Sequence, residues 1–180
     1  KKNYQELGLN KVDAMKQASY HIQEALRIDP NDSITHSNFA SLLEQNYQEL
    51  GLNKVDAMNQ ASYHIQEALR IDPNNLPAHS NYAILLKENY QELGLSKQKA
   101  MNQANYHYQE ALKDKNNKYY LWIMTLYADF LLNFVGDKQN ALSKYQIALK
   151  LMNDNPHLPN WITKEDIKMN IEFIQVSWKW

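Results

Sequence analysis

Hydrophobic residues recur at steps of three and four along most of this chain, which is the spacing of one face of an α-helix. Between residues 76 and 93 the mostly apolar positions of this face are His79, Tyr82, Ala83, Leu86, Tyr90 and Leu93. Gly94 follows, and a glycine just past the last periodic residue typically closes a helix in the left-handed conformation. We therefore expect a helix that ends before Gly94.

A second helix is expected immediately upstream, beginning at residue 54. Asn53 is predicted to be its N-cap, with Asp56 three residues later as part of a capping box. Pro73 ends the helix because proline cannot continue it and disfavours a helical conformation in the residue before it. Its apolar and small positions are Val55, Met58, Ala61, Ser62, Ile65, Ala68 and Leu69. Each unit then consists of two antiparallel helices of about 17 residues.

The unit recurs with a period of 43 residues, and residues 3–45 and 46–88 are identical at 34 of 43 positions. A third copy covers residues 89–118 and diverges after Leu112, and it leads into a shorter hairpin at 119–152. Self-similarity at such a period is typical of solenoids. We therefore expect an all-α protein, an α-solenoid of antiparallel helix hairpins over residues 1–152. A loop at 153–162 and an amphipathic C-terminal helix at 163–180 follow.

The second helices share a small-large-small pattern, which a proline follows in the first two units. Its four occurrences are Ala18, Ile22, Ala25 and Pro30; Ala61, Ile65, Ala68 and Pro73; Ala104, Tyr108 and Ala111; and Ala141, Tyr145 and Ala148. This pattern resembles the second helix of a tetratricopeptide repeat, and Phe39-Ala40 and Tyr82-Ala83 resemble the first. The resemblance implies a right-handed superhelix, a fold that serves as a generic binding scaffold.

The period differs from that of the family, whose usual unit has about 34 residues. We attribute the excess to an extra turn on both facing helices, through Tyr47, Leu50, Val55 and Met58. HEAT and armadillo repeats, with periods of about 40 to 47 residues, are the structural alternative.

In tetratricopeptide arrays the first helices line the concave groove. Residues 36–41 and 79–84 resemble the first helices of the array of O-GlcNAc transferase, where an asparagine two residues before the small residue holds extended peptide backbone. The resemblance assigns this role to Asn38 and Asn81, whose amides offer both a donor and an acceptor. The residues expected on the same face are Ser37, Ser80, Ser41, Ile84, Glu44 and Lys87. An ordinary polar residue on a solvated helix face is the alternative for both asparagines.

The predicted C-terminal helix, with Thr163 as N-cap, has two apolar sides. Ile167, Ile171, Ile174 and Trp178 fall on one side, and Met169, Phe173, Val176 and Trp180 fall on the other. The terminal helix of a repeat array is expected to be polar on its outer face. We therefore expect Met169, Phe173, Val176 and Trp180 to form an oligomer or partner interface.

Composition narrows the functional classes. The chain has no cysteine and a net charge of −1, so disulfides, thiol catalysis and a strongly basic nucleic-acid surface are not expected. No apolar run approaches the length of a membrane-spanning helix, and we expect an intracellular, cytoplasmic protein. No catalytic motif, metal site, cofactor site or small-molecule substrate site is recognised. His21, His64 and His107 recur once per unit and are interpreted as a convex surface position copied by duplication.

Three functions remain open at this stage. We expect a non-enzymatic scaffold that binds a peptide or a partner protein along its concave face. The alternative is a self-assembling homo-oligomer that stacks head to tail. The stacking contact would join the C-terminal helix to the open first repeat, because residues 1–7 align with the end of a first helix and the chain is expected to begin partway through a unit. A regulatory module from a larger enzyme is the third option.

Overall fold

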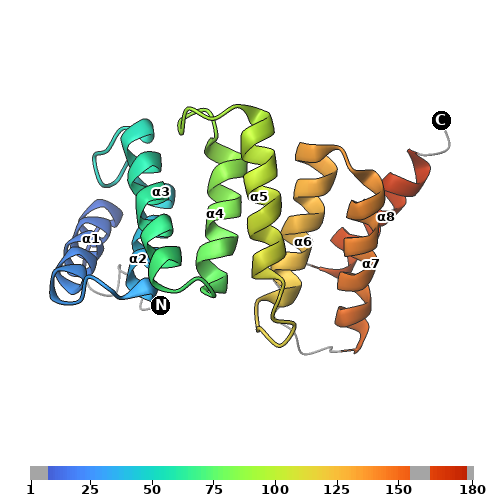
Figure 1. Ribbon diagram of the computed structural model, residues 1–180, viewed down its shortest axis with the longest axis horizontal. Helices are drawn as coiled ribbons and strands as arrows, with labels where there is room; N and C mark the ends of the chain where they lie inside the picture. The colour runs from blue at the N-terminus through green and yellow to red at the C-terminus, as the bar shows by residue number, and fades with distance from the viewer. Residues whose placement is uncertain (1–7, 155–162, 178–180) are drawn as a thin grey trace. The chain divides into compact units, whose positions relative to one another are not determined.

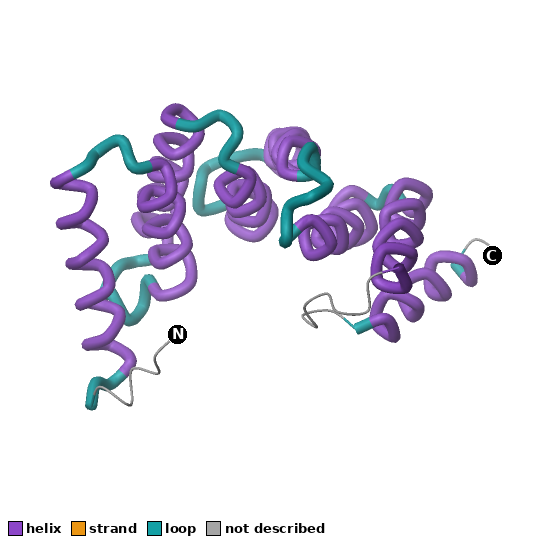
Figure 2. The backbone as a smooth tube through the Cα atoms, turned by 90° about the horizontal axis from the view of Figure 1, so that it is seen from below, coloured by secondary structure: helices purple, strands orange, loops and turns teal. Residues whose placement is uncertain are grey.

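The computed structural model describes residues 8–154 and 163–177, and in these residues all regular structure is helical. The helices pack as sequential antiparallel pairs (Figures 1 and 2). In chain order they are α1 (Lys11–Ile28), α2 (Ser33–Asn46), α3 (Lys54–Ile71), α4 (Leu76–Asn89), α5 (Lys97–Ala111), α6 (Tyr120–Phe130), the π-helix η2 (Leu131–Val135), α7 (Lys138–Asp154) and α8 (Lys164–Val176).

The chain divides into two compact units, residues 1–110 and 111–180. In the first unit α2 packs most extensively against α3, and it also contacts α1 and α4. One hydrophobic core of this unit lies among α2, α3 and α4. Its buried members are Phe39, Ala40, Leu43, Ala57, Met58, Ala61, Ile65, Ala68, Ala78 and Leu85.

The helix ends follow the capping chemistry expected from the sequence. The side chain of Asn53 accepts a hydrogen bond from the backbone N–H of Asp56 at 2.9 Å, which confirms the predicted N-cap. Beyond α2, Gly51 has φ of +74° and the N–H of Leu52 donates to the carbonyl of Tyr47 at 2.9 Å. This six-residue closure is the Schellman motif, in which glycine avoids the steric cost of a left-handed residue. The regular α-helix ends earlier than expected, at Asn46, and a tightened turn leads to Gly51.

The extra length of the unit is only partly used for packing. Met58 is fully buried, and Tyr47 and Leu50 pack against the core. Val55 is 49% exposed, so its predicted place between the facing helices is wrong. The physical reason is angular, because two residues span about 200° of an α-helix and Ala57 occupies the buried face.

In the second unit α6 and η2 pack against α7, and α7 packs against α8. η2 continues α6 in a wider coil, and Gly136, with φ of +85°, closes it. On α7 the small-large-small residues Ala141, Tyr145 and Ala148 are all buried, as the repeat pattern predicts. The hydroxyl of Tyr145 donates to the carboxylate of Asp129 on α6. Burial of the phenol, and then this carboxylate, raise the pKa of Tyr145.

Candidate functional site

The face formed by the first helices α2 and α4 carries the residues predicted to bind peptide. The two helices contact each other directly, and Asn81 of α4 bridges them. Its amide nitrogen lies 2.9 Å from the hydroxyl of Ser41 and 3.2 Å from that of Ser37, and it donates to both. Asn81 therefore joins neighbouring repeats, and its carbonyl oxygen is the part of the amide left for a ligand.

Asn38 differs from Asn81 although the repeat makes them equivalent. Its side chain is exposed, so both its donor and its acceptor face solvent. Ser37 and Ser80 are 3% and 2% exposed, and the hydroxyl of Ser80 donates to the carbonyl of Pro77. These two serines are structural rather than accessible, and Asn38 is the open polar group of this face.

Glu44 is the unusual charged group of the same face. Its carboxylate is half-buried, and burial, followed by the charge of Glu88, raises its pKa to about 7. The amide of Asn89 is 3.4 Å from the carboxylate and supplies only a weak hydrogen bond. Lys87 forms an ion pair with Glu88 at 2.7 Å. Ile84, which lies between Asn81 and Lys87 in the sequence, is half-buried. The face thus carries a carboxylate that a cationic ligand would stabilise.

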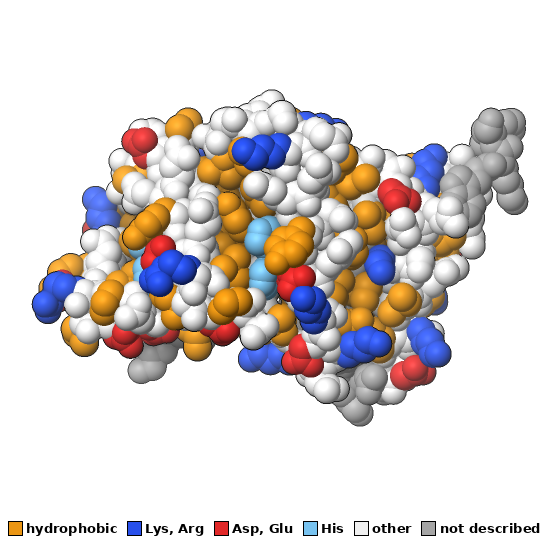
Figure 3. Space-filling view, viewed as in Figure 1, with side chains coloured by type: hydrophobic (Ala, Val, Ile, Leu, Met, Phe, Trp, Pro, Cys, Tyr) orange, Lys and Arg blue, Asp and Glu red, His pale blue; other side chains and the backbone are white. Residues whose placement is uncertain are grey.

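Two histidine pairs are the main feature that sequence reasoning missed. Nδ1 of His36 on α2 lies 2.9 Å from Nδ1 of His64 on α3. Nδ1 of His79 on α4 lies 2.8 Å from Nδ1 of His107 on α5. The two rings of each pair are 5.1 Å apart between centroids. Figure 3 shows pale-blue histidine side chains reaching the surface between hydrophobic ones.

A hydrogen bond to a backbone carbonyl fixes the tautomers in each pair. Nε2 of His36 lies 3.1 Å from the carbonyl oxygen of Pro30, and Nε2 of His79 lies 3.0 Å from that of Pro73. A carbonyl can only accept, so Nε2 of His36 carries a hydrogen and the neutral ring offers a lone pair at Nδ1. Nδ1 of His64 must then carry the hydrogen that joins the two rings. In each pair a chain of two hydrogen bonds therefore runs from a second helix to a first helix, and from there to the turn that precedes the first helix.

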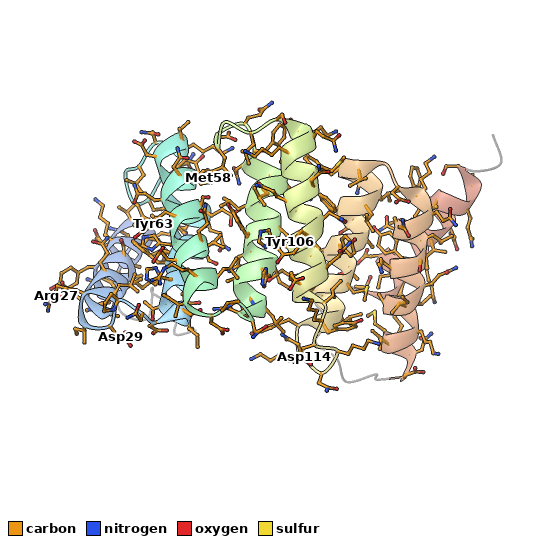
Figure 4. All side chains as sticks on the ribbon, in the orientation of Figure 1. Arg27, Asp29, Met58, Tyr63, Tyr106 and Asp114 are labelled. Atoms are coloured by element: carbon orange, nitrogen blue, oxygen red, sulfur yellow. The ribbon has the colours of Figure 1, made fainter. Side chains whose placement is uncertain are left out.

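Aromatic residues enclose the pairs. The ring of Phe39 meets His64 edge-on at 4.7 Å, and Tyr82 lies at the same distance from His107. Tyr63 and Tyr106, labelled on α3 and α5 in Figure 4, are more than half exposed and flank the pairs on the outside. Burial is the main cause that lowers the pKa of His64 and of His107 to about 4 each. The charge that the partner ring would carry adds to this effect.

The interpretation of these histidines as surface positions fits His21, which is exposed. His64 and His107 are half-buried, and each contacts a histidine of a first helix, which the interpretation did not include. The sequence carried a signal for the pairing. His36 precedes His64 by 28 residues, and His79 precedes His107 by the same 28 residues. A repeated interval between a first-helix and a second-helix histidine indicates one contact made twice.

An open pocket of about 260 Å³ lies beside the first pair, among α1, α2 and α3. Its lining includes Ser19, Gln23 and Phe39. In the next repeat Tyr82 stands at the position of Phe39, and its hydroxyl lies 3.0 Å from the amide of Gln66 and 3.3 Å from the hydroxyl of Ser62. Phe39 has no hydroxyl, and at this side of the pocket the amide of Gln23 donates to the hydroxyl of Ser19 at 2.9 Å.

The predicted interface on α8 is partly described. Thr163 and Asp166 form the expected capping box, and Ile167 and Ile174 are buried at 1% and 0% exposure. Met169, Phe173 and Val176 are 63%, 60% and 56% exposed. Trp178 and Trp180 lie outside the described residues. The described part of α8 therefore has one apolar face in the fold and one in solvent.

The remaining candidate chemistry is limited. Among residues 8–154 and 163–177, no three His, Asp or Glu side chains are grouped so that they could hold a metal ion. In the same residues no helix combines the length and apolar character needed to cross a membrane. Comparisons with protein-family models, with curated proteins and with solved structures found no match to this chain.

Proposed function

We propose that this chain is a non-enzymatic protein-interaction scaffold, a tetratricopeptide-like solenoid that holds a peptide or partner protein along the face of α2 and α4. The contact between two successive first helices supports the proposal, because a solenoid forms its inner surface in this way. The observation that carries it is the accessible amide of Asn38 together with the half-buried carboxylate of Glu44 on the same helix, α2. An amide that pairs with peptide backbone and a carboxylate that pairs with a cationic side chain fit an extended basic peptide.

The test is a selection of binding peptides from a displayed random library, followed by affinity measurements on variants. Asn38→Ala should weaken binding and leave the unfolding midpoint unchanged, because the side chain is exposed. Asn59→Ala removes an exposed amide from α3 and serves as the matched control. If Asn38→Ala binds the selected peptides as tightly as the Asn59→Ala control does, the proposal that Asn38 holds the peptide backbone is wrong.

Asn81 requires a different expectation. Asn81→Ala removes the hydrogen bonds to Ser37 and Ser41, so it should lower the free energy of unfolding by about 1 kcal/mol as well as affinity. Glu44→Gln should reduce the preference for peptides with Lys or Arg. If the selected peptides show no enrichment in Lys or Arg, the carboxylate has no part in recognition.

Head-to-tail self-assembly is the second candidate, and the exposed stripe of Met169, Phe173 and Val176 on α8 favours it. A contiguous apolar stripe of this kind is a feature of interaction surfaces. Light-scattering mass should then rise with concentration, and Phe173→Glu should abolish the rise. A constant monomer mass of about 21.2 kDa at all concentrations would exclude this function.

A further inference from the structure

The helices α1 and α3 have almost the same sequence and very different surroundings. Over Lys11–Ile28 and Lys54–Ile71 they differ only where Lys16 of α1 is replaced by Asn59 in α3. On α3 the residues that face α2 are sealed from solvent: Ala57, Ala61 and Ala68 are 0% exposed and Ile65 is 1% exposed. This helix sequence therefore has an apolar face that another helix covers in the fold.

The equivalent face of α1 is open. We name it the open face of α1, and its members are Ala14, Ala18, His21, Ile22 and Ala25. Ala14, Ala18 and Ile22 are half-buried, whereas His21 and Ala25 are exposed. Leu26 on the adjoining flank of α1 packs against the core, and Ile22 lies at the border, where it also contacts the core. Among the described residues, no helix lies over the open face as α2 lies over α3.

The intramolecular contact shows which chemistry covers such a face. On α2 it is supplied by His36, Phe39, Ala40 and Leu43, all at most 6% exposed. The alanines of the two helices permit a close approach, the leucine and the aromatic ring fill the remaining space, and His36 meets His64. On α4 the same positions are His79, Tyr82, Ala83 and Leu86, and His79 meets His107. The shared pattern is His-x2-(Phe/Tyr)-Ala-x2-Leu.

We propose that the open face of α1 is a docking site for a helix with the pattern His-x2-(Phe/Tyr)-Ala-x2-Leu, presented by another repeat of this type. His21 then forms the Nδ1–Nδ1 hydrogen bond that His64 and His107 form within the chain. The three alanines of the open face accept the incoming helix as their counterparts on α3 accept α2. This contact would continue an interface that the chain already makes, at a surface separate from the α2–α4 groove.

The exposed stripe of α8 does not fit this site. Met169, Phe173 and Val176 include no histidine, and Ile174 follows Phe173 where the pattern requires alanine. A branched residue there would hold the helices apart, because the small residue is what permits the close approach. The pattern therefore favours a helix of the α2 type over the α8 of a second copy.

The probe for the test is a fluorescent synthetic peptide of residues 32–52, which contains α2 with its N-cap and its glycine closure. It is titrated into the full chain. We expect saturable binding that is lost when the peptide carries Phe39→Asp and weakened when it carries His36→Ala. In the full chain, Ala25→Glu should weaken binding about tenfold or more, because it places a carboxylate against an apolar helix face.

A matched control separates this effect from a general change in charge. Lys16→Glu places a carboxylate on the opposite side of α1, and both Lys16 and Ala25 are exposed, so both variants should fold. Lys16→Glu should bind the probe like the unmodified chain, and so should Asn38→Ala in the groove. The imidazole signals of His21 should shift on binding, which a docking event elsewhere would not cause.

Three outcomes would overturn the proposal. The first is no saturable binding of the probe up to millimolar concentration. The second is binding that Ala25→Glu leaves unchanged. The third is self-association of the chain that Ala25→Glu abolishes while the probe does not bind, which would show that a second copy occupies the open face.

Discussion

Nδ1 of His36 on α2 lies 2.9 Å from Nδ1 of His64 on α3, and the other nitrogen of His36 contacts the carbonyl of Pro30. The chain makes the same arrangement again with His79, His107 and Pro73. Each of these hydrogen-bond chains joins two helices and a turn, and burial disfavours a positive charge on His64 and on His107. Because these two contacts hold the repeats together, the stability of the fold should depend on pH.

The first prediction concerns stability between pH 4 and pH 7. Burial lowers the pKa of His64 and of His107 from 6.5 to about 4, so in this window the unfolded chain binds about two more protons at these sites. The contribution of these two neutral histidines to the free energy of unfolding is complete above pH 6.5 and is lost as pH falls to about 4. Glu44 acts in the opposite direction, because its pKa is raised from 4.5 to about 7 and the folded chain binds its proton first. The contribution of Glu44 is complete below pH 4.5 and is lost as pH rises to about 7.

The net difference is about one proton, so the free energy of unfolding should fall by about 1.4 kcal/mol per pH unit at most as pH decreases. Glu44→Gln removes the opposing group and should about double this slope. His64→Gln should reduce it. Urea unfolding at a series of pH values measures all three, and an equal slope in the Glu44→Gln variant and the unmodified chain would contradict the assignment of Glu44.

The second prediction concerns coupling within a pair. In a double-mutant cycle of His36→Ala and His64→Ala, the interaction energy should be about 0.5–1.5 kcal/mol, because either single change leaves the partner without its hydrogen bond. The cycle of His79→Ala and His107→Ala should give a similar value. A crossed cycle of His36 and His107 joins residues of different pairs and should be additive within about 0.5 kcal/mol. Coupling of equal size in the crossed cycle would argue against a direct contact.

The elements of this fold were predictable because their signals are local. The N-cap Asn53, the glycine closure at Gly51 and the buried residues Ala61 and Ile65 each follow from residues a few positions apart. The error at Val55 came from extending a stripe into the first turn, where a two-residue offset moves a side chain to the far side of the helix. Periodicity thus defines the helices better than it defines which side chains at their ends are covered.

The candidate site was less predictable because its contacts join different helices. Asn38 and Asn81 are equivalent in sequence, yet Asn81 is engaged by Ser37 and Ser41 while Asn38 is exposed. Asn81 has these partners because α2 lies next to α4, and the sequence of the segment around Asn81 does not show which helix is its neighbour. The His36–His64 contact similarly depends on the register of two packed helices.

The third prediction uses the difference between the repeats at Phe39 and Tyr82. Phe39→Tyr adds a hydroxyl beside Ser19 and Gln23, whose counterparts Ser62 and Gln66 bind the hydroxyl of Tyr82. We expect this change to stabilise the chain by about 0.5–1.5 kcal/mol.

Tyr82→Phe is the reciprocal change and should destabilise the chain by a similar amount. Thermal unfolding of the two variants and of the double exchange tests the pair. Loss of stability in Phe39→Tyr would mean that the pocket of about 260 Å³ does not accept the hydroxyl.

The last prediction concerns the buried polar contact that joins α2, α3 and α4. The amide nitrogen of Asn75 donates to the hydroxyl of Ser33 at 2.5 Å, and that hydroxyl donates to the carbonyl of Ala68 at 3.0 Å. The carbonyl oxygen of Asn75 also caps α4 by accepting from the N–H of Ala78. Asn75→Asp keeps the cap but places a buried carboxylate beside a hydroxyl whose hydrogen is already committed. The free energy of unfolding should fall by about 1–3 kcal/mol.

The preceding repeat supplies the matched control for this change. Asp32 caps α2 at the position equivalent to Asn75. Its carboxylate accepts hydrogen bonds from the N–H groups of Ile34 and Thr35, and the residue is partly exposed to solvent. Asp32→Asn keeps an acceptor for these donors, so it should cost less than Asn75→Asp, about 1 kcal/mol or below. Urea unfolding of the two single variants at neutral pH measures the difference. Equal losses would show that the contact with Ser33 adds nothing to the role of Asn75 as a cap, because the contacts of Asp32 with Ile34 and Thr35 stay within the first turn of α2.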